Sequence, residues 1–143
     1  MKTSDIRFIN RQTKSVLRPS KKWRIFYDTV FDIFLNDVKV GYVELADNPT
    51  GWDETTLGVM KIEILPEYRR QGLATRALQR LMELIRPDYV YAEITNTLSY
   101  GLFCTVFGEP IDIEFEADIR RLSKTPCFIG KKYTVDMIFE NIC

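Results

Sequence analysis

The residues with the clearest chemical potential form the stretch 69–78, "RRQGLATRAL", where two sequence patterns meet. The preceding "TLGVMKIEILP" is rich in branched apolar residues and predicts a strand, whereas apolar residues recur at helical spacing from 74 to 85. A helix N-terminus offers unpaired N–H groups and the positive end of the helix dipole, and both attract anions. Gly72 allows close backbone approach, and Arg69 and Arg70 add charge-assisted hydrogen bonds. The stretch predicts a diphosphate-binding loop; the alternative is an ordinary polar loop with a chance glycine.

Composition limits the classes of protein to which the chain can belong. With 143 residues, 45% hydrophobic, we expect one domain spanning 1–143. Twenty Lys and Arg balance twenty Asp and Glu, so we expect no nucleic-acid partner and no membrane partner. Three cysteines without a C-x-x-C pair, and no signal peptide or long apolar run, predict a cytoplasmic protein with reduced thiols.

Histidine is absent from the sequence. This removes the usual general base, every Ser/His or Cys/His dyad, and the commonest ligand of transition metals. We therefore expect no metal site, and any catalysis must rest on carboxylates, tyrosines, thiols or backbone dipoles.

The elements around the loop predict a mixed α/β domain. A β-meander is expected over about 23–46, with a turn at Asn36 and Asp37. "DYVYAEIT" predicts the strand after the helix, "NTLSYGLFCTVF" a second helix, and "DIEFEADI" with "KKYTVDMIFE" a terminal antiparallel hairpin. Within the strand before the loop, strict alternation predicts one apolar face and one mixed face. The apolar face would hold Gly58, Met60, Ile62 and Ile64, and the other would hold Val59, Lys61 and Glu63.

At this point the sequence resembles the GCN5-related N-acetyltransferase (GNAT) family. Arg69, Gly72 and Ala74 match the family signature [Q/R]-x-x-G-x-[G/A], and "ILPEYRR", "FDIFLNDVKVGYVEL" and "ITNTLSYGLF" are similar to its flanking segments, over about 30–108. The resemblance implies a single-domain GNAT-like fold, with a mostly antiparallel central sheet, a parallel pair of strands four and five, and flanking helices. Only about 19 residues separate "IRFIN" from "VFDIFL", so at most one short helix fits and the first helical segment is shortened.

The resemblance also implies acetyl-CoA as co-substrate, bound in an opening between strands four and five. The backbone of Ile64 and Leu65 would pair with the pantetheine arm. Asn96 matches a position that contacts the cofactor near the fifth strand. The diphosphate would lie on a loop formed by Arg69, Arg70, Gln71, Gly72, Leu73 and Ala74, assisted by Thr75.

The implied reaction is acetyl transfer to a primary amine, which benefits from a base. Glu93 is the first candidate, because some protein-acetylating members carry a glutamate in a similar place, and Glu63 is the second, although Lys61 could neutralise it. The family's usual tyrosine acid is replaced by Phe103. Tyr100 and Cys104 lie within one helical turn of that position and could substitute, but both also fit core packing.

The segment between the first strand and the meander bears on the acceptor. A shortened helical segment predicts an open acceptor groove, which suits a protein or peptide slightly better than a small amine, and a homodimer that completes the groove is compatible with the sequence. Two alternatives stay open. One is a non-catalytic module of GNAT fold that binds acetyl-CoA or a protein partner, and the other is a structural protein that binds no nucleotide.

Overall fold

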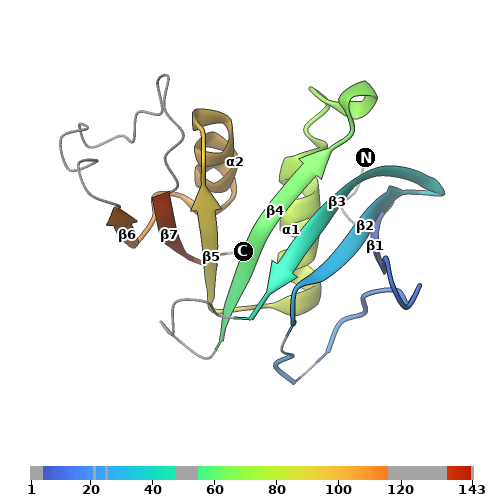
Figure 1. Ribbon diagram of the computed structural model, residues 1–143, viewed down its shortest axis with the longest axis horizontal. Helices are drawn as coiled ribbons and strands as arrows, with labels where there is room; N and C mark the ends of the chain where they lie inside the picture. The colour runs from blue at the N-terminus through green and yellow to red at the C-terminus, as the bar shows by residue number, and fades with distance from the viewer. Residues whose placement is uncertain (1–4, 21, 25, 48–54, 116–134, 143) are drawn as a thin grey trace.

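The computed structural model describes residues 5–20, 22–24, 26–47, 55–115 and 135–142. They form a seven-stranded sheet of order β1-β2-β3-β4-β5-β7-β6 and two α-helices, shown in Figure 1. The β4–β5 pair is parallel and the other five pairs are antiparallel, which confirms the expected mixed α/β fold. The strands are β1 (Ile6–Asn10), β2 (Thr29–Leu35), β3 (Val38–Ala46), β4 (Thr56–Ile64), β5 (Tyr89–Ile94), β6 (Asp112–Phe115) and β7 (Val135–Glu140).

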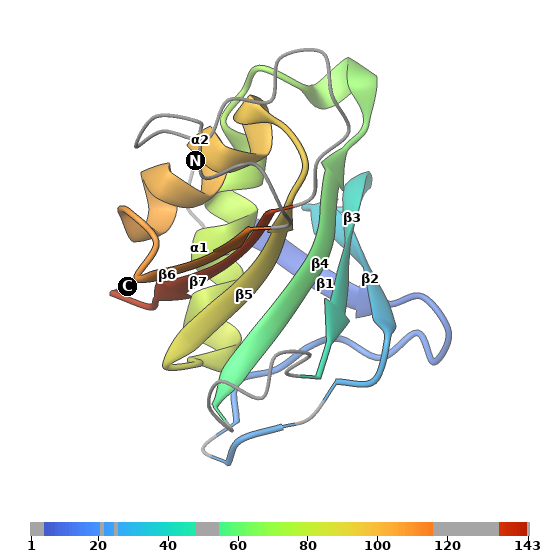
Figure 2. The same cartoon turned by 60° about the vertical axis from the view of Figure 1, so that its left-hand side comes forward.

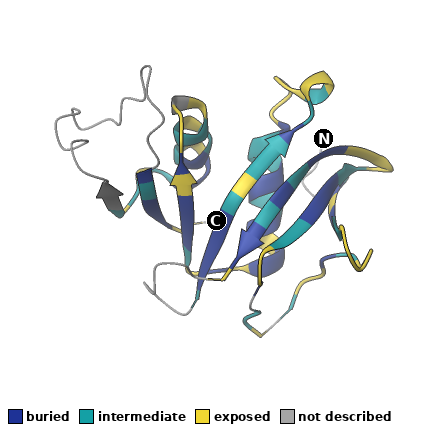
Figure 3. Cartoon of the chain, viewed as in Figure 1, coloured by how far each residue is buried: buried dark blue, intermediate teal, exposed yellow. Residues whose placement is uncertain are grey.

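The two helices, α1 (Leu73–Ile85) and α2 (Thr97–Phe107), lie on the same side of the sheet, as the views in Figures 1 and 2 agree. The apolar stripe of α1 is buried there, and Figure 3 shows the buried residues concentrated on this helix and in the strands. Leu78 and Leu81 are fully buried. This packing follows from the helical spacing of the apolar residues, which gives α1 one face suited to a core.

The segment that joins β1 to β2 contains no helix among its described residues. It packs on the helix-covered side instead, where Leu17 and Phe26 join the core and the Arg24 guanidinium donates a hydrogen bond to the Leu84 carbonyl oxygen (3.1 Å). The opposite face of the sheet therefore carries no helix from the described part of the chain. This agrees with the shortened helical segment that the sequence predicts.

A β-bulge in β4 corrects the predicted assignment of its faces. In the pairing with β3, Lys61 lies opposite Glu44 while Val59 lies opposite Leu45, so Met60 is an extra residue. Directly paired residues share a face of the sheet. Val59, Ile62 and Ile64 consequently lie on the core side of the sheet, opposite Leu45, Val43 and Gly41 of β3. Lys61 and Glu63 lie on the opposite face, which carries no described helix and is called the bare face. Strict alternation separated Val59 from Ile62 and was wrong, because the bulge shifts the period by one residue.

The same bulge coincides with the point where β4 leaves β5. Parallel pairing joins residues 56–59 of β4 to residues 89–92 of β5 and ends there, and the two strands diverge beyond it in Figure 1. On its other edge β4 stays against β3, where a Cβ at Gly41 would overlap the Glu63 carbonyl oxygen. The opening therefore forms on the β5 side of β4.

Two other expectations have mixed outcomes. The meander begins at Thr29 rather than near Trp23, because Trp23 and Phe26 pack onto the core as separate anchors instead of pairing in a strand. The turn at Asn36 and Asp37 is confirmed, with Asn36 in the left-handed conformation (φ 56°) that asparagine tolerates. The terminal hairpin is confirmed as β6 and β7, and the remaining residues of its two predicted stretches, 116–119 and 131–134, lie outside the described residues.

Candidate active site

The N-terminus of α1 presents free N–H groups to an open space. The Arg76 N–H makes the first helical bond, to the Gly72 carbonyl oxygen (3.2 Å), so the N–H groups of the preceding turn have no intrahelical acceptor, and no side chain caps them. Gly72 adopts the left-handed conformation (φ 71°), which glycine enters without strain. A Cβ built on Gly72 meets no atom within 4 Å, so an anion can approach the backbone there.

A cavity of about 450 Å³ lies above this helix terminus, between the end of β4 and the start of α2. Most of the residues predicted to bind the cofactor line it, namely Ile64, Arg69, Arg70, Gly72, Leu73, Ala74, Thr75 and Asn96. Leu65 and Gln71 do not line it, and the Leu65 N–H donates to the Val40 carbonyl oxygen (2.8 Å).

Sequence reasoning missed several residues of this cavity, namely Ile62, Tyr68, Leu98, Ser99 and Leu102. Those on α2 could have been found from their spacing, since Asn96 with Ser99 and Leu98 with Leu102 each share a helical face. Asn96 is the N-cap of α2, where its Oδ1 accepts hydrogen bonds from the N–H (2.8 Å) and the hydroxyl (3.1 Å) of Ser99. The cap thereby fixes the end of α2 that borders the cavity.

The two arginines of the loop are arranged differently. The Arg69 side chain turns back to β4, where its Nε donates to the Ile64 carbonyl oxygen (2.8 Å) and a terminal nitrogen lies 3.4 Å from Glu63 Oε1. Arg70 is exposed and adopts a left-handed backbone conformation (φ 65°), which is uncommon outside glycine. Arg69 therefore links the loop to the end of β4, while Arg70 places a positive charge on the solvent side of the cavity.

A second cavity of about 320 Å³ adjoins the first, because Ile62, Glu63, Asn96 and Ser99 line both. It occupies the region where β4 and β5 diverge. Its other lining residues are Val59, Met60, Lys61, Glu93, Thr95 and Phe103. The structure thus brings the two carboxylates predicted from the sequence, Glu63 and Glu93, to one cavity.

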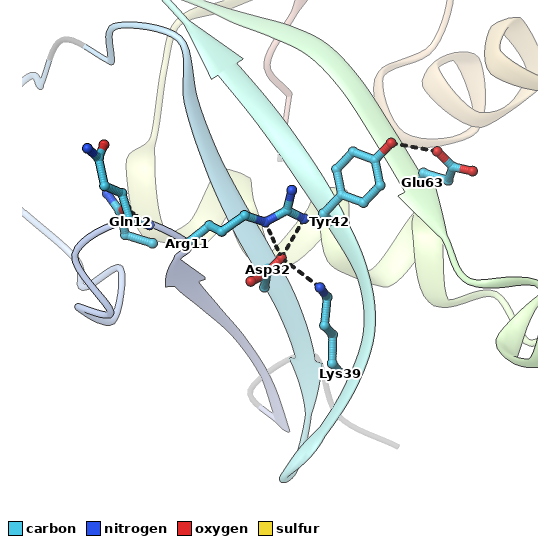
Figure 4. Close-up of polar contacts among 7 residues, drawn as sticks. Arg11, Gln12, Asp32, Lys39, Tyr42 and Glu63 are labelled. Carbon is cyan, nitrogen blue, oxygen red and sulfur yellow. Dashed lines mark hydrogen bonds and ion pairs between the residues drawn. The ribbon is translucent and has the colours of Figure 1, made fainter.

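Glu63 is held in a polar network that weakens it as a base. The Tyr42 hydroxyl donates to Glu63 Oε2 (2.7 Å, Figure 4), and Lys61 Nζ lies 3.7 Å from the same oxygen. The hydrogen bond from Tyr42, followed by the positive charges of Lys61 and Arg69, lowers the pKa of Glu63. A carboxylate with a lowered pKa has less tendency to take a proton from an amine.

Glu93 has fewer partners. It is exposed at the end of β5, the Tyr91 hydroxyl lies 3.3 Å from its Oε1, and it forms no ion pair within the described part of the chain. Of the two carboxylates, Glu93 is the one whose charge is not already matched by a neighbouring cation.

The wall of the second cavity is apolar where the family would place a tyrosine. The Phe103 ring is 4% exposed and stacks against Phe139, with ring centroids 5.5 Å apart. Tyr100 and Cys104 line neither cavity and pack against the core. Burial, with a hydrogen bond to Cys104, raises the pKa of Tyr100 to about 12, and burial raises the pKa of the Cys104 thiol.

A second polar cluster extends across the bare face of the sheet and was not predicted from the sequence. The Arg11 guanidinium donates from Nε (3.0 Å) and a terminal nitrogen (2.7 Å) to Asp32 Oδ1, and Lys39 Nζ lies 3.2 Å from that oxygen, as Figure 4 shows. Arg11 also lies over the Tyr42 ring, 5.1 Å from its centroid. Their positions in the sequence gave no signal, because the sheet register alone brings them together.

The described residues offer neither a cluster of metal ligands nor a membrane-spanning helix. No group of three or more His, Cys, Asp or Glu residues within the described ranges could hold a metal ion. No described helix is long and apolar enough to cross a membrane.

Comparison with known families identifies the class of protein. Residues 5–104 match the acetyltransferase (GNAT) family, so the chain belongs to the GNAT acetyltransferases. The match covers the sheet from β1 to β5, the loop before α1, and most of α2. No curated protein matches the sequence at a significant level.

Solved structures of this fold are similar to the chain at low sequence identity. The diaminobutyrate acetyltransferase of Paenibacillus lautus, in complex with L-2,4-diaminobutyric acid and coenzyme A, is 18% identical with a TM-score of 0.58, over 79% of this chain and 70% of that one. A GNAT acetyltransferase of Elizabethkingia anophelis with acetyl-CoA bound is 14% identical (TM-score 0.52; 79% and 74% covered). A putative acetyltransferase of Salmonella typhimurium with acetyl-CoA is 18% identical (0.54; 78% and 64%).

Proposed function

We propose that this protein transfers an acetyl group from acetyl-CoA to a primary amine. The observation that carries the proposal is the pair of adjoining cavities at the β4–β5 divergence. One cavity contains an uncapped helix N-terminus with a cationic loop, which suits a diphosphate. The other contains a carboxylate without a matching cation, which suits an amine.

Acetyl-CoA fits the first cavity by its chemistry. Its diphosphate would accept hydrogen bonds from the N–H groups at the start of α1, next to Gly72, and the charge of Arg70 adds to this attraction. Its pantetheine arm would follow the end of β4, beyond the bulge, where β5 no longer pairs with the strand. The acetyl group would then reach the residues shared by the two cavities.

Glu93 is the proposed base. An alkylammonium with a pKa near 10.4 costs roughly 4 to 5 kcal/mol to deprotonate at pH 7, so a proton acceptor beside the amine accelerates the reaction. Glu93 accepts the proton, the neutral nitrogen attacks the thioester carbon, and the C–S bond breaks as the C–N bond forms. Glu63 is the poorer base because its pKa is already lowered.

The departing thiolate must be protonated without a tyrosine in the cavity wall. Phe103 has no hydroxyl, and Tyr100 and Cys104 line neither cavity. Since an ordinary thiol has a pKa near 8.5, CoA thiolate can leave and take its proton from water. We propose that water performs this step and relays to the thiolate the second proton, which the nitrogen loses as the amide forms.

The acceptor is more readily a protein or peptide than a small amine. The sheet face on the Glu63 side carries no helix from the described residues, so an extended chain can reach the second cavity along it. The alternative, a non-catalytic module that binds acetyl-CoA, is supported by Phe103, which removes the expected acid, and by the absence of a helix from the described residues between β1 and β2.

Binding and turnover are tested separately. Calorimetry with CoA and acetyl-CoA measures cofactor binding, and release of free thiol in the presence of peptides, proteins and amines measures transfer, with mass spectrometry locating the acetyl group. We expect binding of both ligands and an acetylated amine. Binding without product across all acceptor classes would favour the non-catalytic module, and no binding would reject both proposals.

A further inference from the structure

Tyr91 is a buried polar residue that the proposed reaction does not yet use. It lies on β5 two positions before Glu93, so both side chains are on the same face of the sheet. Its residue is 3% exposed, and its hydroxyl lies 3.3 Å from Glu93 Oε1. Asp136 of β7 is the register partner of Glu93, and its negative charge also acts on this hydroxyl.

This arrangement places one donor between two acceptors. A tyrosine hydroxyl has a single proton to donate, and ionised carboxylates only accept. Glu93 and Asp136 are register partners, and like charges directly opposite one another on neighbouring strands repel, so a donor that reaches both would reduce the repulsion. Burial, followed by the hydrogen bond and charge of Asp136 and then by Glu93, raises the pKa of Tyr91 far above its ordinary value. The hydroxyl therefore keeps its proton at neutral pH.

We propose that Tyr91 is a positioning residue, whose buried hydroxyl bridges the carboxylates of Glu93 and Asp136 and fixes the orientation of Glu93 at the edge of the second cavity. This inference rests on the proposed function, because it assigns Glu93 the role of base. When Glu93 takes the proton of the amine it becomes a weaker acceptor, and the hydroxyl turns to Asp136. Tyr91 itself neither gains nor loses a proton.

Residues around Glu93 belong to three neighbouring elements. Lys61 and Glu63 of β4 line the same cavity and are paired with each other. From α2 the cavity receives Asn96, Ser99 and Phe103, none of which titrates. On the far side of Asp136, Glu114 of β6 is its register partner. Among the residues that the structure describes, Lys61 is therefore the only cation that lines the second cavity, and its partner Glu63 offsets it.

Two substitutions should shift the pH profile of kcat/KM in opposite directions. Tyr91→Phe removes the shared donor and leaves two adjacent carboxylates, so the acidic limb of kcat/KM should rise by about one pH unit. Asp136→Asn removes the repelling charge, so the limb should fall below the wild-type position. A merely structural role would not produce opposite shifts.

Matched controls identify the hydroxyl and the base. Tyr89→Phe removes a hydroxyl from the same strand and should leave the limb unchanged. In a Glu93→Gln background the limb attributed to Glu93 should be gone, and Tyr91→Phe should then produce no further shift. A shift that persists without Glu93 would overturn the assignment.

A second readout does not depend on turnover. Carbon-13 NMR of the glutamate side-chain carboxyls, with Glu93 assigned by its loss in Glu93→Gln, follows the titration of Glu93 in the folded protein. We expect a higher midpoint in Tyr91→Phe and a lower one in Asp136→Asn. Unchanged midpoints, or shifts of the same sign, would overturn the role of Tyr91 even if the enzyme is active. If the wild type forms no product, the proposed function fails, and the NMR midpoints still decide whether Tyr91 bridges the carboxylates.

Discussion

Gly72→Asp should weaken CoA binding through charge, and Gly72→Asn is its matched control. A Cβ at Gly72 meets no atom within 4 Å, so neither side chain is excluded by packing. Both residues tolerate the left-handed conformation of this position (φ 71°) at a similar cost of about 1 kcal/mol. The two variants therefore share shape and backbone strain, and differ in one negative charge beside the proposed diphosphate.

The size of the charge effect follows from Coulomb's law. At the high dielectric of an exposed position, a carboxylate about 5 Å from the two negative charges of the diphosphate is repelled by about 2 kcal/mol. This repulsion would weaken CoA binding roughly 30-fold. Calorimetry with CoA at low salt should show this difference between Asp and Asn, and added salt should reduce it. Equal dissociation constants for the two variants would show that the diphosphate binds elsewhere.

Three further predictions concern the base, the bare face and the missing acid. Glu93→Gln should lower kcat about 100-fold or more at pH 7, with partial recovery at higher pH where more amine is neutral, and a wild-type profile in thiol-release assays would remove Glu93 as the base. Despite the opposing effect of burial, hydrogen bonds from Arg11 and Lys39 lower the pKa of Asp32 in the folded state, so its stabilisation is present above the unfolded pKa and is lost as the pH falls through the folded one. Asp32→Asn should therefore cost about 1 kcal/mol in urea unfolding at pH 7 and much less at acidic pH, whereas a pH-independent cost would contradict the ion pairing. Phe103→Tyr adds a hydroxyl to the wall of the second cavity and should raise kcat severalfold if protonation of the thiolate limits the rate; an unchanged kcat would show that water suffices.

Local sequence patterns were enough to predict most of the helices and strands. The helical spacing from Ala74 to Ile85, the glycine before it and the alternating strands on either side are short-range signals, and α1, β4 and β5 formed where they predicted. The bulge at Met60 could not be predicted, since nothing in "TLGVMKIEILP" marks it. It arises from the register with β3, which is a long-range property.

The loop of the candidate site was predictable from the sequence, whereas the surroundings of its two carboxylates were not. The loop that lines the first cavity is contiguous in sequence, so one motif identified most of it. Glu63 and Glu93 were recognised as candidates, and so was Lys61 as a partner of Glu63. The neighbours on other strands were not, namely Tyr42 of β3 beside Glu63 and Asp136 of β7 opposite Glu93.

The sequence by itself determined most of the elements, the glycine and the two arginines of the loop before α1, and the absence of histidine chemistry. These follow from residue type and spacing along the chain. Only the tertiary structure decided where β4 parts from β5, which carboxylate is paired with cations, and that the Tyr91 hydroxyl lies beside Glu93. Those properties depend on residues far apart in sequence that the sheet register brings into contact, and a carboxylate responds to the charges around it rather than to its neighbours in the chain.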